Sequence, residues 1–416
     1  MRLGPLRHRW FAAFTGAIGL GGIADEVARL ALPLLILDLT HSIAAAATLR
    51  VVQAVPYIFF GGIAGVVIDR VDKRKLLVAC DLVGIALTAA IPISFDMGVF
   101  SLQLLYTIGF LLGTVEVLWG VTTDFSVVPA LVEPDELTSA NAAYLGVDRA
   151  ARVVGPTIGG FAIAALGDAH AMWIAALAFV PTLPVWLRIP PIDVASSAPI
   201  TLRNIADELA EGFRFVWRSP VLRWLAVLMS FANLGGVGVQ TLVLYVLREE
   251  QRLPEVTIGI ALSIAGAVTI VSSFLAPRFA RGRPLGHSML AVAACSGLVL
   301  ALTSLARDWR LVVAGFALRE TTWSSFIVYA FVPRQREVPA RLRGRANGAF
   351  RTVVLISNSL SPAFLSTVVL VASSAVAFAV AGALALLGVV VAYFTPLRRY
   401  NLNEPVPEER AAEAAK

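Results

Sequence analysis

Charged side chains are scarce in this chain of 416 residues. Asp, Glu, Lys and Arg make up 15% of it, whereas they make up about 25% of ordinary soluble domains. Hydrophobic residues make up 58%, and the mean hydropathy is +0.78. A chain this apolar has too little polar surface to face water everywhere. The composition excludes an ordinary soluble domain and predicts an integral membrane protein.

Residues that hold metals or form disulfides are also few. The two cysteines, Cys80 and Cys295, stand in apolar context, which predicts two buried thiols and not a disulfide or a metal pair. The sequence shows no phosphate-binding glycine loop, no His/Cys metal cluster and no nucleophile constellation. We therefore expect no enzymatic activity, no cofactor and no bound metal.

Positive charge is present, but it is confined to short blocks. The net charge is +6, a sign that could indicate a nucleic-acid partner. The Lys and Arg residues stand between apolar segments, however, where membrane insertion alone accounts for them. We expect contact with a lipid bilayer and no nucleic-acid binding.

Long apolar segments occupy most of the chain. A helix that spans a bilayer needs about 20 predominantly apolar residues, and we predict twelve such spans, six on each side of a polar stretch. The predicted spans are 10–38, 43–69, 75–97, 100–128, 138–167, 169–188, 221–248, 254–279, 284–306, 308–333, 344–370 and 373–396.

Charge in the connections predicts the orientation. The N-terminal residues and the connections 69–75, 188–220, 277–283, 333–345 and 396–399 carry most of the Lys and Arg. The positive-inside rule places these segments in the cytoplasm. We predict a multi-pass protein of the plasma (cytoplasmic, inner) membrane with both termini in the cytoplasm.

The polar stretch predicts a linker between two bundles. Within it, apolar residues recur at helical spacing, which favours a helix lying on the membrane surface; a connector with no role beyond packing is the alternative. Those apolar residues are Leu202, Ile205, Leu209, Phe213 and Val216. The predicted parts are an N-terminal bundle (1–189), the linker (190–220), a C-terminal bundle (221–397) and a cytoplasmic tail (398–416).

The two bundles share a sequence pattern. Trp119 and Pro129 follow Glu116 by three and thirteen residues, and a second Glu, Trp and Pro follow the same spacing about half a chain later, as Glu320, Trp323 and Pro333. Pro156 likewise follows Asn141 by fifteen residues, as Pro362 follows Asn347. Two ordered matches indicate a parallel duplication. Six helices plus six helices is a transporter design, although channels are also built from repeats.

One stretch makes the pattern more specific. "GGIAGVVIDRVDKRKLL" (61–77) resembles the signature loop between the second and third helices of the major facilitator superfamily, with Asp72 in place of the usual glycine. The resemblance implies the major facilitator fold, all-α with two pseudo-symmetric six-helix bundles. It also implies a latch in which Asp69 meets the helix N-terminus near 344–348 when the cytoplasmic side is closed; the alternative is that the cations only fix topology. The latch residues are Gly61, Gly65, Asp69, Arg70, Lys73 and Arg74.

A second motif lies in the fifth predicted span. "RVVGPTIGG" (152–160) resembles the signature associated with antiporters of the superfamily. Its glycines remove side-chain bulk and its proline removes a backbone donor. We expect a flexible hinge at Gly155, Pro156, Gly159 and Gly160, with plain helix packing as the alternative. The wider pattern resembles the branch with macrolide-efflux and siderophore-export permeases.

Several charges lie near the middle of predicted spans. Each costs about 2.5–3.5 kcal/mol at a membrane centre on insertion scales, so it normally faces a cavity or a partner. Local i,i+4 pairs are expected for Asp25 with Arg29 and for Asp148 with Arg152, whereas Glu26 lacks such a local partner. Arg50 is expected to reach a membrane face by snorkelling. The mid-span charges are Asp25, Glu26, Arg29, Glu116, Asp148, Arg149, Arg152, Arg319 and Glu320.

These charges suggest a proton-linked cavity. The resemblance implies that the first, fourth, seventh and tenth spans line it, with Glu116 and Glu320 on opposite walls. We expect Asp25, Glu26 and Glu116 to carry protons, and a structural network with Arg29, Arg149 and Arg152 is the competing interpretation. The second half offers milder groups, Asn233, Gln240 and Trp323.

We therefore predict a monomeric secondary transporter. It would export amphipathic organic compounds, such as antibiotics or secondary metabolites, in exchange for protons by alternating access, and so confer multidrug resistance. A siderophore exporter or lysophospholipid carrier of the same fold is the alternative, with Arg29, Arg149 and Arg319 clamping an anionic substrate. A non-transporting membrane receptor or scaffold is a remote alternative.

Overall fold

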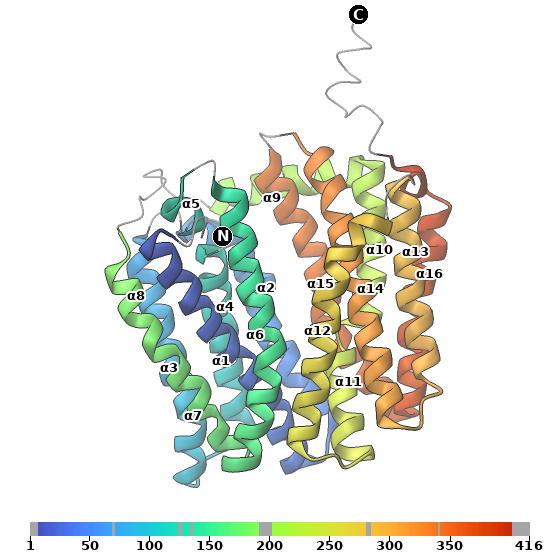
Figure 1. Cartoon of the computed structure of the whole chain (residues 1–416). Coiled ribbons are helices and arrows are strands. Elements are labelled where there is room, and N and C mark those ends of the chain that lie inside the picture. The colour runs from blue at the N-terminus through green and yellow to red at the C-terminus, as the bar shows by residue number, and fades with distance from the viewer. Residues whose placement is uncertain are drawn as a thin grey trace, which may run out of the picture. The chain divides into compact units, whose positions relative to one another are not determined.

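The computed structural model describes residues 7–68, 71–123, 127–133, 136–190, 202–279, 284–339 and 342–401. Within these ranges the regular structure is helical (Figure 1). Eight of the described helices are long and apolar enough to cross a membrane, judged by length and composition. The described structure thus agrees with the all-α membrane protein that the sequence predicts.

The first half of the chain forms long helices joined by short connections. Their bounds are α1 (Arg9–Thr40), α2 (Ile43–Ile68), α3 (Lys73–Asp96), α4 (Leu102–Thr122), the short α5 (Val128–Leu131), α6 (Leu137–Leu166), α7 (Asp168–Phe179), the 3₁₀ turn η4 (Val180–Thr182) and α8 (Leu183–Arg188).

The second half begins with a helix in the predicted linker and continues with further long helices. Their bounds are α9 (Leu202–Arg218), α10 (Pro220–Gly236), α11 (Val239–Tyr245), the π turn η5 (Val246–Glu250), α12 (Glu255–Phe279), α13 (Leu285–Thr303), α14 (Trp309–Arg336), α15 (Arg343–Val371), α16 (Ser374–Tyr393) and the 3₁₀ turn η7 (Pro396–Arg399).

Two predicted spans are interrupted. The segment 169–188 changes from α7 to η4 and α8 where Pro181 and Pro184 remove two backbone donors. The segment 221–248 breaks between α10 and α11, where the amide of Gly238 donates to Ser361 Oγ at 2.8 Å. Both breaks lie within apolar sequence, so hydropathy alone gives no sign of them.

Polar residues at helix starts explain where several helices begin. Each accepts a hydrogen bond from a backbone N–H of the first turn, which has no partner within the helix. The capping residues are Asp72, Ser101, Ser219, Asp308 and Ser373. Asp72 accepts from the amides of Arg74 at 3.0 Å and Lys75 at 3.3 Å. This cap gives the departure from the glycine of the family motif a structural role.

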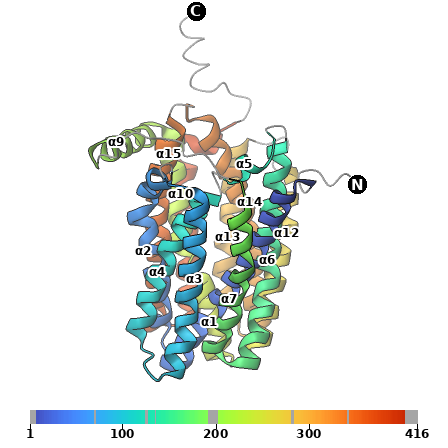
Figure 2. The ribbon, with the colours of Figure 1, turned by 90° about the vertical axis from the view of Figure 1, so that its left-hand side faces the viewer.

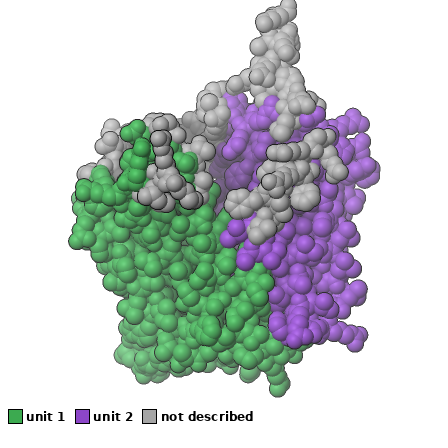
Figure 3. Space-filling view, viewed as in Figure 1, with its two compact units in different colours: residues 1–200, 247–266 green, residues 201–246, 267–416 purple. Residues whose placement is uncertain are grey.

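The chain divides into two compact units, which Figure 3 colours separately. Unit 1 comprises residues 1–200 and 247–266, and unit 2 comprises 201–246 and 267–416. In unit 1, α1 packs against α6 and α7, α2 against α4, and α3 against α4 and α7 (Figures 1 and 2). In unit 2, α10, α13, α15 and α16 pack together, and α14 covers α13.

Each unit has its own apolar core. In unit 1, Phe11, Phe14 and Trp186 are fully buried, and the rings of Phe14 and Trp186 meet edge to face with centroids 6.0 Å apart. In unit 2, Met289 on α13 and Phe350 on α15 belong to one buried apolar cluster. Large apolar side chains are exposed along the helices elsewhere, as with Phe59, which is 67% exposed. Such outward-facing apolar surface suits contact with lipid chains.

One cysteine departs from the expectation. Cys80 is buried, as predicted, whereas Cys295 on α13 is exposed. In a bilayer an apolar environment does not require burial inside the protein, because lipid surrounds the outer faces of the helices. The prediction of two buried thiols is therefore wrong for Cys295.

A short segment of the second half, residues 247–266, belongs to unit 1. It packs closely on α6, where Gly259 meets Pro156, and ion pairs connect it to the end of α1. The Arg248 guanidinium donates from Nε to Asp38 Oδ1 at 2.7 Å and from Nη2 to Asp38 Oδ2 at 2.6 Å. Its Nη1 donates to Glu255 Oε1 at 2.5 Å. Paired contacts of this kind fix geometry as well as adding energy. His41 also lies 3.1 Å from Glu249.

The segment expected to hold a linker contains the helix α9. It crosses the ends of α10 and α15 in Figure 2 and contacts both. Val216 is buried against unit 2, whereas Phe213 and Trp217 are exposed. Exposed apolar side chains on such a helix suit a membrane interface.

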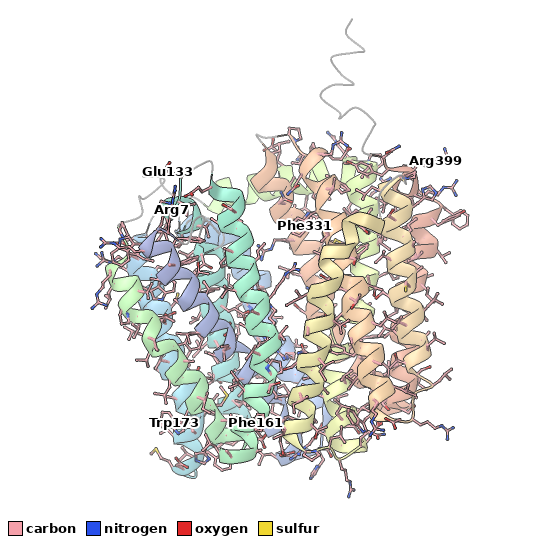
Figure 4. All side chains as sticks on the ribbon, in the orientation of Figure 1. Arg7, Glu133, Phe161, Trp173, Phe331 and Arg399 are labelled. Carbon is pink, nitrogen blue, oxygen red and sulfur yellow. The ribbon has the colours of Figure 1, made fainter. Side chains whose placement is uncertain are left out.

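Ion pairs lie at both ends of the helices in unit 1, for example Arg7 with Glu136 at one end and His170 with Asp96 at the other. Arg7 and Glu133 lie at one end, and Phe161 and Trp173 lie toward the other (Figure 4). Near the first end, Arg7 and His8 both pair with Glu136. This end carries the charged groups that precede α1 and α6.

Replacing Asp72 with alanine removes the α3 cap. The Asp72→Ala variant should lose about 0.5–2 kcal/mol of unfolding free energy, because the first-turn amides lose their acceptor. Denaturant unfolding in detergent micelles measures this loss, and Asp72→Ser, which keeps an acceptor, should remain close to wild type. Equal stability of the alanine and serine variants would contradict the capping role.

Candidate functional site

A cavity of about 280 Å³ lies inside unit 1. Its walls come from α1, α2, α3, α4 and α7, so the first half of the chain forms it alone. A cavity of this size suits a small organic molecule or one end of a larger one. Its polar and aromatic lining is Asp25, Arg29, Arg50, Gln53, Tyr57, Asp81, Glu116, Trp119 and Phe179.

Arg29 is the central cation of this cavity. Its Nη2 lies 3.4 Å from Glu116 Oε1, and its Nε lies 3.7 Å from Glu26 Oε1. The side chain of Glu116 is 47% exposed, whereas that of Glu26 is 10% exposed. One guanidinium thus joins an enclosed carboxylate on α1 to an open carboxylate on α4.

Glu26 has a second cationic partner on α6. Arg152 Nη1 lies 3.9 Å from Glu26 Oε1, and Arg152 Nε donates to Asp148 Oδ2 at 3.0 Å. The predicted pair of Asp148 with Arg152 is therefore confirmed. We call the chain Asp148–Arg152–Glu26–Arg29–Glu116 the charge network; it connects α6, α1 and α4.

Two expectations about α1 are wrong. Asp25 forms no ion pair with Arg29 or with any other described residue. Glu26, expected to lack a local partner, pairs with Arg29 three residues later and also with Arg152 on α6. Successive residues of a helix point about 100° apart, so the two carboxylates cannot face the same way. Glu26 is buried against α6, where Gly155 leaves room for it, and Asp25 faces the cavity.

Of the other arginines in unit 1, Arg50 lines the cavity and Arg149 is outside the cavity lining. Arg50 was expected at a membrane face, but it lines the cavity and donates from Nη2 to the carbonyl of Arg29 at 3.2 Å. Gln53 and Tyr57 follow it at spacings of three and seven, on the same helix face. This spacing is a signal in the sequence that would have located the wall. Arg149 is half-buried on α6 and forms no ion pair among the described residues.

Sequence reasoning also missed Asp81. This residue is 4% exposed on α3 and accepts hydrogen bonds from the hydroxyl of Thr182 and from Trp186 Nε1, the latter at 2.5 Å. It is the only charged residue between 76 and 95. A single charged residue in so long an apolar stretch is the signal in the sequence that could have identified Asp81 as a site residue.

The expected hinge residues lie where α6 meets its neighbours within unit 1. A Cβ at Gly155 would overlap Glu26, and one at Gly159 would lie 3.3 Å from Val27 Cα. A Cβ at Gly160 would overlap the backbone of Glu255 on α12. The helix continues through Pro156, so these positions permit close packing on two sides.

The expected latch residues lie partly outside the described residues. Asp69 and Arg70 fall there, and Gly61 and Gly65 are described only as part of α2. Lys73 is 3% exposed, and Arg74 donates from Nη1 to the carbonyl of Ile189 at 3.4 Å.

Unit 2 has a separate polar cluster. Arg319 is 4% exposed, pairs with Glu320 and lies over the Trp323 ring at 5.2 Å from its centroid. Its guanidinium lies against Gly236, where a Cβ would overlap it. Asn233, one turn earlier on α10, is 1% exposed, and its amide group has no hydrogen-bond partner among the described residues. Gln240 lies on α11 and is half-buried.

Comparison with known families matches almost the entire chain. A major facilitator family model described as "Transmembrane secretion effector" matches residues 1–415. The multidrug efflux pump Tap of Mycolicibacterium fortuitum is 26% identical over 411 residues, which cover 96% of this chain and 98% of that protein. The enterobactin exporter EntS of Escherichia coli O139:H28 is 26% identical over 312 residues, which cover 73% and 71%.

Solved transporter structures share the fold. A bacterial homologue of the iron transporter ferroportin in an inward-facing state gives a TM-score of 0.72 at 20% identity, covering 92% of this chain and 98% of that chain. A mutant of the nucleoside transporter NupG gives 0.75 at 12% identity, covering 92% and 99%. At these identities the likeness concerns the fold alone.

The charge network can be tested by double-mutant cycles. Arg29→Gln with Glu26→Gln should show a coupling of about 0.5–3 kcal/mol, the range found for side chains in one network. Arg29→Gln with Asp25→Asn should show much less, because those side chains form no ion pair. Unfolding free energies of the single and double variants in micelles give both couplings, and a larger coupling to Asp25 would contradict the described geometry.

Proposed function

Because the chain belongs to the transmembrane secretion effector family of the major facilitator superfamily, we propose that it exports amphipathic organic compounds in exchange for protons. Membership makes it a membrane efflux transporter for small molecules. Proton exchange, alternating access and the residues involved are our proposal. The observation that carries it is the cavity of unit 1, in which two carboxylates face open space beside a network of ion pairs.

The open carboxylates give proton and substrate a common site. Asp25 has no ion pair among the described residues, and Glu116 is held only by the 3.4 Å contact with Arg29. Each carboxylate can bind a proton or the positive group of a substrate, but not both together. Competition of this kind makes release of one depend on arrival of the other.

The charge network transmits that exchange to the helices. When Glu116 takes a proton, its attraction for Arg29 falls, and Arg29 is left with Glu26 alone. Glu26 in turn contacts Arg152 on α6. A change at the cavity thereby alters the forces between α1, α4 and α6, which is what a transporter needs to favour one of its states.

The aromatic side chains define the substrate class. Tyr57, Trp119 and Phe179 line the same cavity as the carboxylates. Aromatic faces and carboxylates together suit an organic cation with an apolar body. In unit 2 we assign Trp323, Gln240 and Glu320, which are half-buried, to the transport path, together with the buried polar residues Arg319 and Asn233.

The remaining parts of the proposal concern architecture. We propose twelve spans in two bundles, 1–189 and 221–397, joined by the linker 190–220 and followed by a cytoplasmic tail. Both termini lie in the cytoplasm, and the transporter works as a monomer. The 61–77 stretch acts as the cytoplasmic latch, and the glycines of α6 allow its neighbours to shift.

Export of an anionic siderophore is the second candidate. The similarity to an enterobactin exporter favours it, and Arg149 lacks an ion pair among the described residues. The other two arginines of the expected clamp are already paired, Arg29 with two glutamates and Arg319 with Glu320. An anion would have to displace those carboxylates, so the geometry favours cations.

Proteoliposomes with an imposed pH gradient test the proposal. Internal pH is followed while macrolides, tetracyclines, cationic dyes and siderophores are added to wild type, Glu116→Gln and the control Glu133→Gln, an exposed carboxylate outside the cavity lining. Substrate-dependent proton flux is expected in wild type and control. Loss of a positioned proton-transfer group costs about 100-fold or more, so Glu116→Gln should lose the flux.

Three outcomes would contradict parts of this proposal. Flux that persists in Glu116→Gln removes Glu116 from coupling and leaves Asp25 and Glu26. Transport of siderophores alone would establish the anionic candidate. Substrate movement without proton flux would contradict proton exchange.

A further inference from the structure

The wall of the same cavity holds a third carboxylate besides Asp25 and Glu116, and this one lies outside the charge network. Asp81 stands eight residues after the start of α3, about 12 Å along its axis, and is 4% exposed. Its hydrogen-bond partners, Thr182 and Trp186, are neutral and come from η4 and α8. Thr182 is 2% exposed and Trp186 is 1% exposed. A buried ionised carboxylate with only neutral partners is costly.

The hydrogen atoms at this site can be counted. The Thr182 hydroxyl lies within hydrogen-bonding distance of two oxygens, Asp81 Oδ2 and the carbonyl oxygen of Phe179, the latter at 2.6 Å. A threonine hydroxyl has one hydrogen, and an ionised carboxylate and a carbonyl only accept. If Asp81 were ionised, one of the two close oxygen–oxygen contacts would therefore lack a hydrogen.

If Asp81 is protonated, there is one hydrogen atom for each of the close contacts. The O–H of its Oδ2 donates to the hydroxyl oxygen of Thr182, whose own O–H donates to the Phe179 carbonyl. Trp186 Nε1 donates to the same Oδ2 at 2.5 Å, because a carboxylic acid O–H oxygen retains acceptor capacity. Each close contact then has one hydrogen.

The surroundings supply groups with which such a proton can exchange. On the elements packed against α3, the residues from Val180 to Trp186 include no titratable side chain, Arg188 follows at the end of α8, and Asp168 and His170 stand at the far end of α7. The titratable and charged groups that share the cavity with Asp81 are Asp25, Arg29, Arg50, Tyr57, Cys80 and Glu116.

We propose that Asp81 is a further proton-carrying residue of unit 1, in addition to Asp25 and Glu116. It holds a proton while its carboxyl bonds to Thr182 and Trp186, and it gives that proton up to the cavity when these contacts open. In the transfer the O–H bond of the acid breaks and a new O–H bond forms on water or on the carboxylate of Asp25 or Glu116. The Asp81 carboxylate is then left facing the cavity, where it can receive a proton again.

The position of Thr182 and Trp186 links this step to a movable part of the fold. Thr182 closes a 3₁₀ turn between Pro181 and Pro184, where the helix has lost two backbone donors. A shift of this interrupted segment relative to α3 would remove both hydrogen bonds of Asp81 together. The proton is thus held or released by a change of helix geometry.

Infrared difference spectroscopy tests whether the proton is present. Full-length protein in lipid is recorded in H₂O and D₂O, and the spectrum of Asp81→Asn is subtracted from that of wild type. A protonated carboxyl band that shifts in D₂O is expected at neutral pH. The band should survive in Glu116→Gln and should move in Thr182→Val, which keeps the shape but removes the hydroxyl.

Proton flux in proteoliposomes tests whether the proton exchanges. Asparagine is neutral and has nearly the shape of the protonated acid. Because Thr182 and Trp186 both contact Oδ2, its side chain can bond to one of them at that position, Thr182 through the amide N–H or Trp186 through the carbonyl, so Asp81→Asn is first checked for wild-type elution. We expect it to bind substrate but to lose proton flux by about 100-fold, as for other positioned proton-transfer groups. The control Glu133→Gln should retain wild-type flux.

The outcomes separate this proposal from the proposed function, on which only its transport consequence rests. Absence of the carboxyl band in the Asp81→Asn difference spectrum would overturn the protonation of Asp81. A band that is present while Asp81→Asn transports like wild type would overturn its exchange. Failure of proton flux in wild type itself would refute proton-coupled export, whereas the infrared result would still decide whether Asp81 carries a proton.

Discussion

A charge inside an apolar helix bundle must find its partner within the bundle, and much of unit 1 follows from that constraint. Arg29 meets it with two carboxylates, one enclosed and one open to the cavity. The enclosed one, Glu26, requires space against α6, and Gly155 provides it. Arg152 then comes within reach of Glu26 from α6. The packing of α1 on α6, the opening toward α4 and the free carboxylate of Asp25 are thus consequences of one set of ion pairs.

The same constraint is met differently in unit 2, although the two halves share a sequence pattern. Glu116 and Glu320 occupy matching positions in the repeat, each three residues before a tryptophan. Glu116 pairs with an arginine on another helix, whereas Glu320 pairs with Arg319, its neighbour on α14. A change of protonation at Glu116 therefore alters forces between helices, but at Glu320 it alters forces within one helix. This difference is why we assign proton exchange to unit 1 and substrate contact to the cluster around Trp323.

Helix positions could be predicted from the sequence far better than side-chain partners. The bounds of α12 agree within one residue with the predicted span 254–279, because a polar segment precedes it. The interruption at Thr182 does not follow from hydropathy, which does not register the donors lost at Pro181 and Pro184, although the two prolines themselves are visible in the sequence. Mid-span charge indicated the site, because burying charge is costly. Which carboxylate pairs with Arg29 could not be predicted from the sequence. Asp25 and Glu26 point in different directions, and the packing of the helices decides which of them meets Arg29. Arg50 was misplaced for the same reason.

Competition between proton and substrate at the open carboxylates is the central claim, and proton release on binding measures it most directly. Calorimetric titration of a cationic substrate into purified wild-type protein, in buffers that differ in ionisation enthalpy, reports the number of protons released. We expect the binding enthalpy to change with the buffer in wild type and to become independent of it when Asp25 and Glu116 are both replaced by their amides. A binding enthalpy that is the same in every buffer for wild type would contradict the account.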